Sequence, residues 1–113
     1  MIVVVCPGQG SQTPGFLVPW LEDPAFAAGL DAMSAASGLD LVAHGTVSDA
    51  DTIRDTAVAQ PLIVAAGILT VRTLCAAGRG DRIAGIAGHS VGEITAAVQQ
   101  FWRLPALPGA SLV

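Results

Sequence analysis

Residues 83–93 read Ile-Ala-Gly-Ile-Ala-Gly-His-Ser-Val-Gly-Glu, and no other part of the chain is as informative. An apolar run, Ile83–Ala87, predicts a strand that leads into the pattern Gly-x-Ser-x-Gly, and residues 93–97 are typical of a helix start. A strand that turns sharply into a helix holds the central Ser90 on a strained corner, where glycines let the backbone segments approach closely. We expect an exposed Ser90 hydroxyl beside the N–H groups of a helix N-terminus, as acyl transfer requires.

Composition bounds the classes of protein to which this chain can belong. Its 113 residues suffice for one modest domain. Hydrophobic residues make up 52% and charged residues only 12%, about half the usual charged share, so many elements must be buried on more than one side. Lysine is absent, and five arginines stand against nine acids, for a net charge of −4. Nucleic-acid binding needs a basic stripe, which this composition does not supply.

The cysteines and the apolar runs indicate in which cellular compartment the protein is expected. Cys6 and Cys75 are far apart in apolar surroundings, which predicts free buried thiols rather than a disulfide framework or a metal site. The N-terminus has no basic region and its apolar run stops at Cys6, so no secretory signal is expected. The apolar stretch Leu62–Leu69 is too short to span a bilayer. We therefore expect a soluble, cytoplasmic protein that has no membrane partner.

The first half of the chain predicts a strand and a capped helix. The β-branched run Ile2–Cys6 is typical of a strand buried on both faces, and residues 7–12 break it into a loop. Asp23 followed by Pro24 predicts a helix start, with the carboxylate as N-cap and proline at the first helical position. Gly38 is expected to end that helix.

Two further helices are expected before the serine motif. Ser48 with Asp51 resembles a capping box that opens a short helix near Ile53. Gln60-Pro61 is expected to open a longer helix, whose apolar residues run nearly all the way round from Leu62 to Leu74, so it should be packed on most sides. The order of strand, several helices, strand, corner and helix predicts a mainly parallel α/β sheet.

The end of the chain departs from this pattern. After Val98, two closely spaced prolines, Pro105 and Pro108, are expected to stop the last helix soon after it begins. We interpret residues 1–98 as the N-terminal part of one domain and residues 99–113 as an aberrant tail, produced by truncation or by a frameshift. Translation of the coding DNA in the other two frames tests the frameshift.

Three motifs together resemble one enzyme family. They are Gly-Gln-Gly-Ser-Gln at 8–12, Ala-Gln-Pro-Leu at 59–62 and Gly-His-Ser-Val-Gly-Glu at 88–93. The sequence resembles the acyltransferases that load malonyl groups onto acyl carrier protein in fatty acid synthesis, from residue 1 to about residue 98, which is less than half of such an enzyme. The resemblance implies an incomplete α/β-hydrolase-like parallel sheet layer, a truncated large subdomain, with the small ferredoxin-like subdomain absent.

The resemblance also implies a two-step reaction and its partners. Ser90 attacks the thioester of malonyl-coenzyme A and holds the acyl group as an ester, which the pantetheine thiol of acyl carrier protein then takes. No metal or cofactor is implied. By resemblance, the backbone N–H groups of Gln9 and Val91 hold the oxyanion, and His89 and Gln9 line the substrate side. The positions agree physically, since Val91 begins a helix and Gln9 lies on a glycine-flanked loop at the carboxyl end of a strand.

Other candidate residues receive no catalytic role. His89 is next to Ser90 at a tight corner, where adjacent side chains project in different directions, so we do not expect His89 to be the base. The alternative to its substrate-lining role is a structural hydrogen bond. His44 is interpreted as a surface or loop residue, and Glu93 as favourable charge in the first helical turn. The family's general base, a downstream histidine, and its carboxylate-binding arginine are not matched, and Arg103 lacks the family's surroundings. Ser90 is therefore a weakly activated hydroxyl.

Two alternatives remain open at the level of sequence. A serine hydrolase or thioesterase of the α/β type shares the serine corner but takes its oxyanion donor from a different loop, so the Gln9 loop directly after the first strand favours the transferase. A non-catalytic fragment or partner module would have to fold stably. A sheet cut after two strands instead leaves an unpaired edge and exposed apolar faces.

Overall fold

The computed structural model describes residues 2–79 and 82–103. The elements in chain order are β1 (Ile2–Cys6), η1 (Pro19–Glu22), α1 (Pro24–Ser37), α2 (Leu41–Thr46), α3 (Ala50–Arg54), α4 (Thr56–Leu74), η2 (Cys75–Arg79), β2 (Ile83–Gly88) and α5 (Gly92–Arg103). The helix after the serine therefore continues five residues past Val98 and ends before Pro105. Most of the expected tail, residues 104–113, lies outside the described residues.

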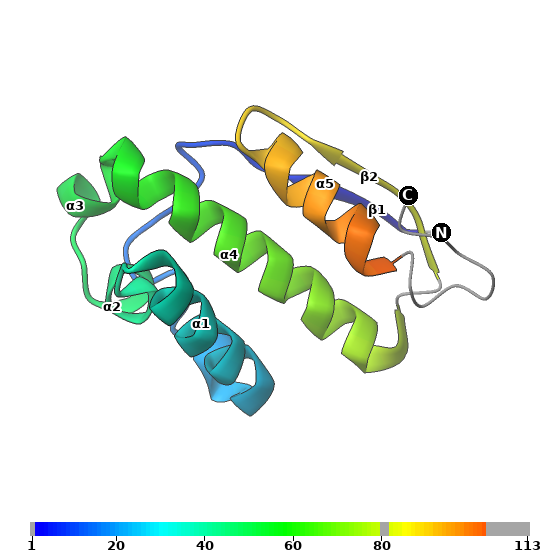
Figure 1. Cartoon of the computed structure of the whole chain (residues 1–113), viewed down its shortest axis with the longest axis horizontal. Helices are drawn as coiled ribbons and strands as arrows, with labels where there is room; N and C mark the ends of the chain where they lie inside the picture. The colour runs from blue at the N-terminus through cyan, green and yellow to red at the C-terminus, as the bar shows by residue number, and fades with distance from the viewer. Residues whose placement is uncertain (1, 80–81, 104–113) are drawn as a thin grey trace.

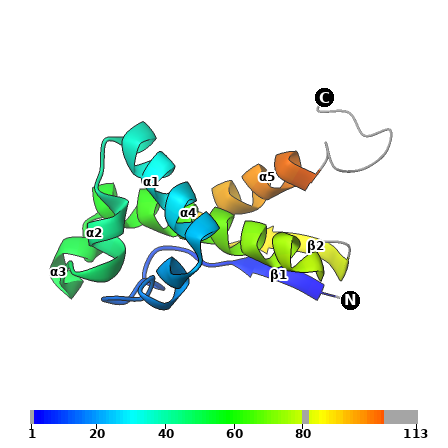
Figure 2. The same cartoon turned by 90° about the horizontal axis from the view of Figure 1, so that it is seen from below.

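The two strands pair in parallel, as the order of elements predicted. Ile2 lies opposite Ile83 and Cys6 opposite Gly88, with one irregularity in register after Ile2. The sheet and α5 lie at one end of the molecule, α1, α2 and α3 gather at the other, and α4 runs between them (Figures 1 and 2). Because the strands are parallel, both carboxyl ends meet at one edge, which brings the loop after β1 to the corner after β2.

The core forms where α1, α2 and α3 pack on α4. Its buried members are mainly aliphatic: Leu17, Phe26, Leu30, Leu41, Ile53, Leu62, Ala65, Ala66 and Leu69. Burial of each large side chain contributes about 2 kcal/mol. Eight residues of α4 between Ala59 and Val71 are buried, and at about 100° per residue they are spread over most of the helix circumference, as the apolar pattern predicted. By length and composition, the helical stretch Thr56–Gly78 could cross a membrane, but here it is the central helix of the fold.

α1 begins and ends at the residues that the local sequence predicted. The Asp23 carboxylate accepts from the N–H groups of Ala25, at 2.9 Å, and Phe26, at 3.4 Å, and Pro24 is the first helical residue. Gly38 ends the helix in the left-handed conformation, with φ +74°. These caps satisfy N–H and C=O groups that a helix end leaves without intrahelical partners.

Two predicted helix starts were wrong by one to several residues, and one helix was missed. α4 begins at Thr56 rather than at Gln60, because the Asp55 carboxylate caps it through the Ala57 N–H at 2.9 Å. Pro61 lies inside α4. The cap of α3 is the carboxylate of Asp49, not the Ser48 hydroxyl, and it accepts from the Thr52 N–H at 2.8 Å. The short helix α2 (Leu41–Thr46) was not predicted.

Predicted burial was also wrong at several side chains. Val3 is 60% exposed and Val5 69% exposed, so β1 is covered on one face only by the described residues. Cys6 is buried as expected, and burial raises the pKa of its thiol, whereas Cys75 is exposed. His44 lies half-buried in α2, with Nδ1 2.9 Å from the Ser48 hydroxyl.

Candidate active site

Ser90 occupies the sharp corner that its motif predicts. It lies between the end of β2 at Gly88 and the start of α5 at Gly92, and its side chain is exposed. Its φ is +56°, the one positive φ of a non-glycine among residues 2–79 and 82–103. Because L-residues rarely adopt this conformation, the surrounding structure must hold it. The strained turn presents the hydroxyl outside both the strand and the helix.

Glycines are required on both sides of this corner by close backbone contacts. A Cβ on Gly92 would overlap the carbonyl oxygen of Cys6 and lie 2.7 Å from that of Pro7. A Cβ on Gly88 would overlap the carbonyl of Gly92. The His89 N–H donates to the Cys6 carbonyl at 3.1 Å and completes the contact. The serine corner is therefore packed directly on the carboxyl end of β1.

The loop after β1 touches Ser90. A Cβ on Gly8 would lie 2.8 Å from the His89 carbonyl oxygen and 3.2 Å from the Ser90 Cβ. Gln9 is thus adjacent to a residue that contacts the serine. Within the described residues, the backbone N–H groups of Gln9 and Val91 donate no hydrogen bond. Both predicted oxyanion donors have an N–H available for a ligand.

The side chain of Gln9 is bonded at the junction of α3 and α4. Its Nε2 donates to the Arg54 carbonyl at 3.3 Å and to the Thr56 hydroxyl at 3.1 Å. The His89 side chain is exposed beside Gly8. The substrate-lining roles given to Gln9 and His89 stay predictions.

No histidine activates Ser90 in the part of the chain that the structure describes. The Ser90 hydroxyl makes no hydrogen bond to any residue of this part. Of the two histidines in the sequence, His44 is bonded to Ser48 in α2 and His89 is next to the serine. The same described residues contain no group of three His, Cys, Asp or Glu side chains that could hold a metal ion.

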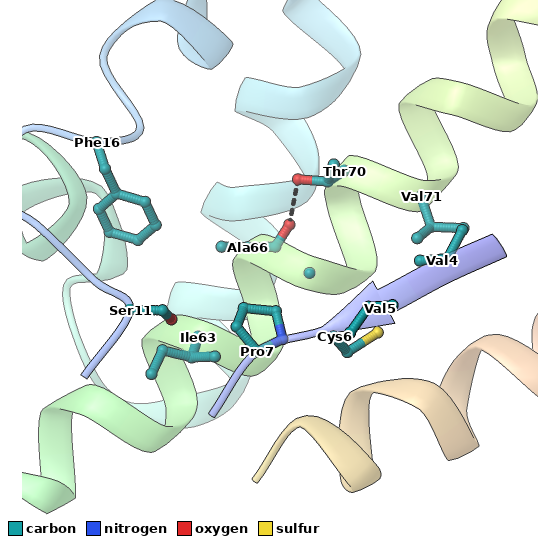
Figure 3. A pocket seen from close by; sticks show the side chains of 11 residues that line it. Val4, Val5, Cys6, Pro7, Ser11, Phe16, Ile63, Ala66, Thr70 and Val71 are labelled. Carbon is teal, nitrogen blue, oxygen red and sulfur yellow. Dashed lines mark hydrogen bonds between the residues drawn. The ribbon is translucent and has the colours of Figure 1, made fainter. Parts of the chain in front are cut away.

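An apolar cavity of about 230 Å³ lies between β1 and α4. Figure 3 shows Val4 of β1 beside Val71 of α4, and Cys6 and Ile63 also line the cavity. The cavity extends to the loop after β1, and Ser90 does not line it. It is a space under the loop rather than the place where an acyl group would meet the serine.

Sequence reasoning missed two residues that shape this loop, Gln12 and Thr56. The Gln12 amide bridges the Gly10 N–H and the Ile53 carbonyl, each at 2.8 Å. Thr56 accepts from the Gln9 side chain. The only sequence signal for Gln12 was its place at the end of the Gly-Gln-Gly-Ser-Gln motif. Nothing local marked Thr56, because it lies 47 residues from Gln9.

A parallel sheet, a serine on a left-handed corner and a glycine-flanked loop beside it are the features of an α/β enzyme with a nucleophilic serine. The comparison with known families agrees: residues 3–100 match the acyl transferase domain, and the chain belongs to this family. It is 52% identical over 99 residues to the malonyl CoA-acyl carrier protein transacylase of Mycobacterium tuberculosis (strain ATCC 25618 / H37Rv). That match covers 85% of this chain and 32% of the relative.

Solved structures show the same relationship. The crystal structure of MCAT from Mycobacterium tuberculosis matches with a TM-score of 0.80 and 49% identity, covering 85% of this chain and 32% of that one. A malonyl-transacylase solved in complex with a type II PKS acyl-carrier protein matches with a TM-score of 0.78 and 32% identity, covering 85% and 31%. The chain spans about a third of the length of the curated relatives it matches.

Proposed function

We propose that this chain carries the nucleophile and oxyanion hole of a transferase that moves a malonyl group from malonyl-coenzyme A to acyl carrier protein, in fatty acid biosynthesis. The observation that carries the proposal is the Ser90 corner, φ +56°, in contact with Gly8 next to Gln9. It occurs in a chain 52% identical to a malonyl CoA-acyl carrier protein transacylase over 99 residues.

The proposed reaction has two steps. The Ser90 oxygen attacks the thioester carbonyl, the carbon–sulfur bond breaks, and coenzyme A leaves with the serine proton as a free thiol. The pantetheine thiol of the carrier protein then attacks the seryl ester, the carbon–oxygen bond breaks, and the proton returns to Ser90. The chemistry needs no cofactor, because coenzyme A enters as part of the substrate. Both thioester partners are soluble, which favours a cytoplasmic reaction.

In this proposal the described residues stabilise the negative charge of the oxyanion but supply no general base for Ser90. The N–H groups of Gln9 and Val91 have no internal partners among the described residues and lie on segments that contact each other. Each donor of such an oxyanion hole contributes about 3 kcal/mol to the transition state. Because no histidine bonds to Ser90 in the described part of the chain, acylation of this chain alone is expected to be slow.

The test is acylation of the purified chain by malonyl-coenzyme A, followed by intact-mass measurement and mapping of the ester. We expect an ester on Ser90 that forms faster as imidazole is added, because free imidazole replaces the missing base. Ser90→Ala should abolish the ester. Ser48→Ala is the matched control, since Ser48 already has a histidine neighbour and its loss should leave acylation unchanged.

Transfer to holo acyl carrier protein then separates the transferase from the hydrolase. The ester should be stable in buffer and disappear only when the pantetheine thiol is present. An ester that is hydrolysed equally fast without the carrier protein would contradict the transferase, and acylation that persists in Ser90→Ala would contradict the site.

A further inference from the structure

Gln12 joins the loop after β1 to the protein core by both ends of its amide. Its Oε1 accepts from the Gly10 N–H and its Nε2 donates to the Ile53 carbonyl, both at 2.8 Å, and the second bond is partly buried. The Ile53 side chain is 2% exposed and belongs to the core. The bridge therefore ties a loop residue to the backbone of a residue whose side chain lies in the core.

The end of α3 makes this bridge favourable. Carbonyl groups in the last turn of a helix lack intrahelical partners. Here the carbonyls of Ile53 and Arg54 receive the side-chain amides of Gln12, at 2.8 Å, and Gln9, at 3.3 Å. Two glutamines from one loop thus satisfy one helix end, and the loop can shift only if those bonds break.

The other side of the loop rests on the serine corner. Gly8 contacts the His89 carbonyl and the Ser90 Cβ, and its own carbonyl accepts from the Ser11 hydroxyl at 3.0 Å. Gln9 therefore lies between Gly8, which packs closely against the serine corner, and Gly10, which is bonded to Gln12. A shift of its backbone N–H relative to the serine would have to disturb one of these two neighbours.

We propose that Gln12 is a positioning residue that fixes the Gln9 N–H relative to Ser90 by anchoring Gly10 to α3. This inference rests on the proposed function, in which that N–H receives the oxyanion. Such donors act because they are in place before charge develops. A displacement of about 1 Å can lower a rate about a hundredfold, so loss of the anchor should slow acylation without changing the nucleophile.

The experiment compares Gln12→Ala, Gln12→Glu and Ser37→Ala in the full chain. Alanine removes both bonds of the bridge. Glutamate keeps an acceptor for Gly10 but cannot donate to the Ile53 carbonyl. The matched control is Ser37→Ala, which removes a hydroxyl that likewise accepts from one backbone N–H and donates to one carbonyl, at the end of α1.

Three quantities are measured: the imidazole-assisted acylation rate at saturating malonyl-coenzyme A, the half-saturating concentration, and hydrogen exchange of the Gly10 N–H. Both Gln12 variants should lose about a hundredfold in rate at an unchanged half-saturating concentration. Gly10 exchange should rise about tenfold in the alanine variant. Ser37→Ala should match the parent in all three, and urea unfolding checks that each variant is folded.

An unchanged rate in either Gln12 variant, or a raised half-saturating concentration at unchanged rate, would overturn the inference. Failure of the parent chain to form any ester would overturn the proposed function instead. In that case hydrogen exchange of the Gly10 N–H alone tests the anchoring role of Gln12. An exchange rate in Gln12→Ala equal to that of the parent would overturn this role.

Discussion

At the scale of single residues, Ser90 shows how backbone geometry and chemistry are linked. Its φ of +56° places a non-glycine residue in the left-handed region, which costs roughly 1–2 kcal/mol. The contacts of Gly88 and Gly92 with neighbouring carbonyls hold that conformation. The strain is local and serves to project one hydroxyl from a tight corner.

Replacement of Ser90 by glycine should therefore stabilise the fold relative to alanine. Both variants lose the hydroxyl, but only alanine keeps the unfavourable φ, so the free energy of unfolding of Ser90→Gly should exceed that of Ser90→Ala by about 1 kcal/mol. Urea unfolding measures the difference. Equal stabilities would show that the corner is not strained.

Gly92→Ala should be destabilising by about 1–3 kcal/mol, because its Cβ would meet backbone atoms that cannot rotate away. Gly85→Ala is the matched control, since a Cβ there meets no atom within 4 Å. Urea unfolding of the two variants should give a large loss for the first and little change for the second. A similar loss of stability in both variants would show that the loss does not come from the close contact of Gly92.

At the scale of elements, short helices depend on their caps. α3 has only five residues and is held by the Asp49 carboxylate, which accepts from the Thr52 N–H at 2.8 Å. The longer α4 and α5 depend on packing. Thr95 of α5 is 1% exposed and contacts Gly67 of α4, and its hydroxyl has no hydrogen-bond partner among the described residues.

Hydrogen bonds from Thr52 hold the pKa of the Asp49 carboxyl below its ordinary value. A lowered folded-state pKa adds stability that is complete above the ordinary aspartate pKa and is lost as pH falls through the folded value. Asp49→Asn keeps an acceptor that does not titrate, so its unfolding free energy should fall less between neutral and acid pH than the parent's. Chemical unfolding across that pH range measures both curves, and parallel curves would contradict the prediction.

Thr95→Val should be neutral or stabilising by up to about 1 kcal/mol, because valine has the same shape and removes an unpaired buried hydroxyl. Thr70→Val is the matched control on α4, where the hydroxyl donates to the Ala66 carbonyl at 2.7 Å, and it should not gain stability. Thermal unfolding compares the two. A loss of stability in Thr95→Val equal to or larger than that in Thr70→Val would show that the Thr95 hydroxyl is bonded in solution.

At the scale of the whole molecule, the fold is well packed at one end and open at the other. The helical end encloses the core, whereas the described part of the sheet has two strands and an exposed face that carries Val3 and Val5. Exposed apolar strands favour association between chains. The structure thus combines a stable helical core with a sheet whose uncovered face is the main risk to solubility.

The double variant Val3→Thr/Val5→Thr should reduce association of the chain at high concentration. Threonine keeps the β-branched shape that suits a strand, and both positions are more than half exposed, so stability should change by less than about 1 kcal/mol. Sedimentation velocity over a concentration series measures the association. Val47→Thr, at a position that is 80% exposed after α2, is the control and should not alter it; an equal effect there would contradict the prediction.

Features that depend on neighbouring residues could be predicted from the sequence alone. Gly88-x-Ser90-x-Gly92 specified the corner, and Asp23-Pro24 specified the start of α1, because caps and turns depend on backbone preferences within a few residues. Which face of β1 is covered, and which groups the glutamines of the loop after β1 bond to, depend on packing between distant segments and could not be predicted locally. Gln12 meets Ile53 across 41 residues, and such a contact exists only after packing has brought α3 beside the loop.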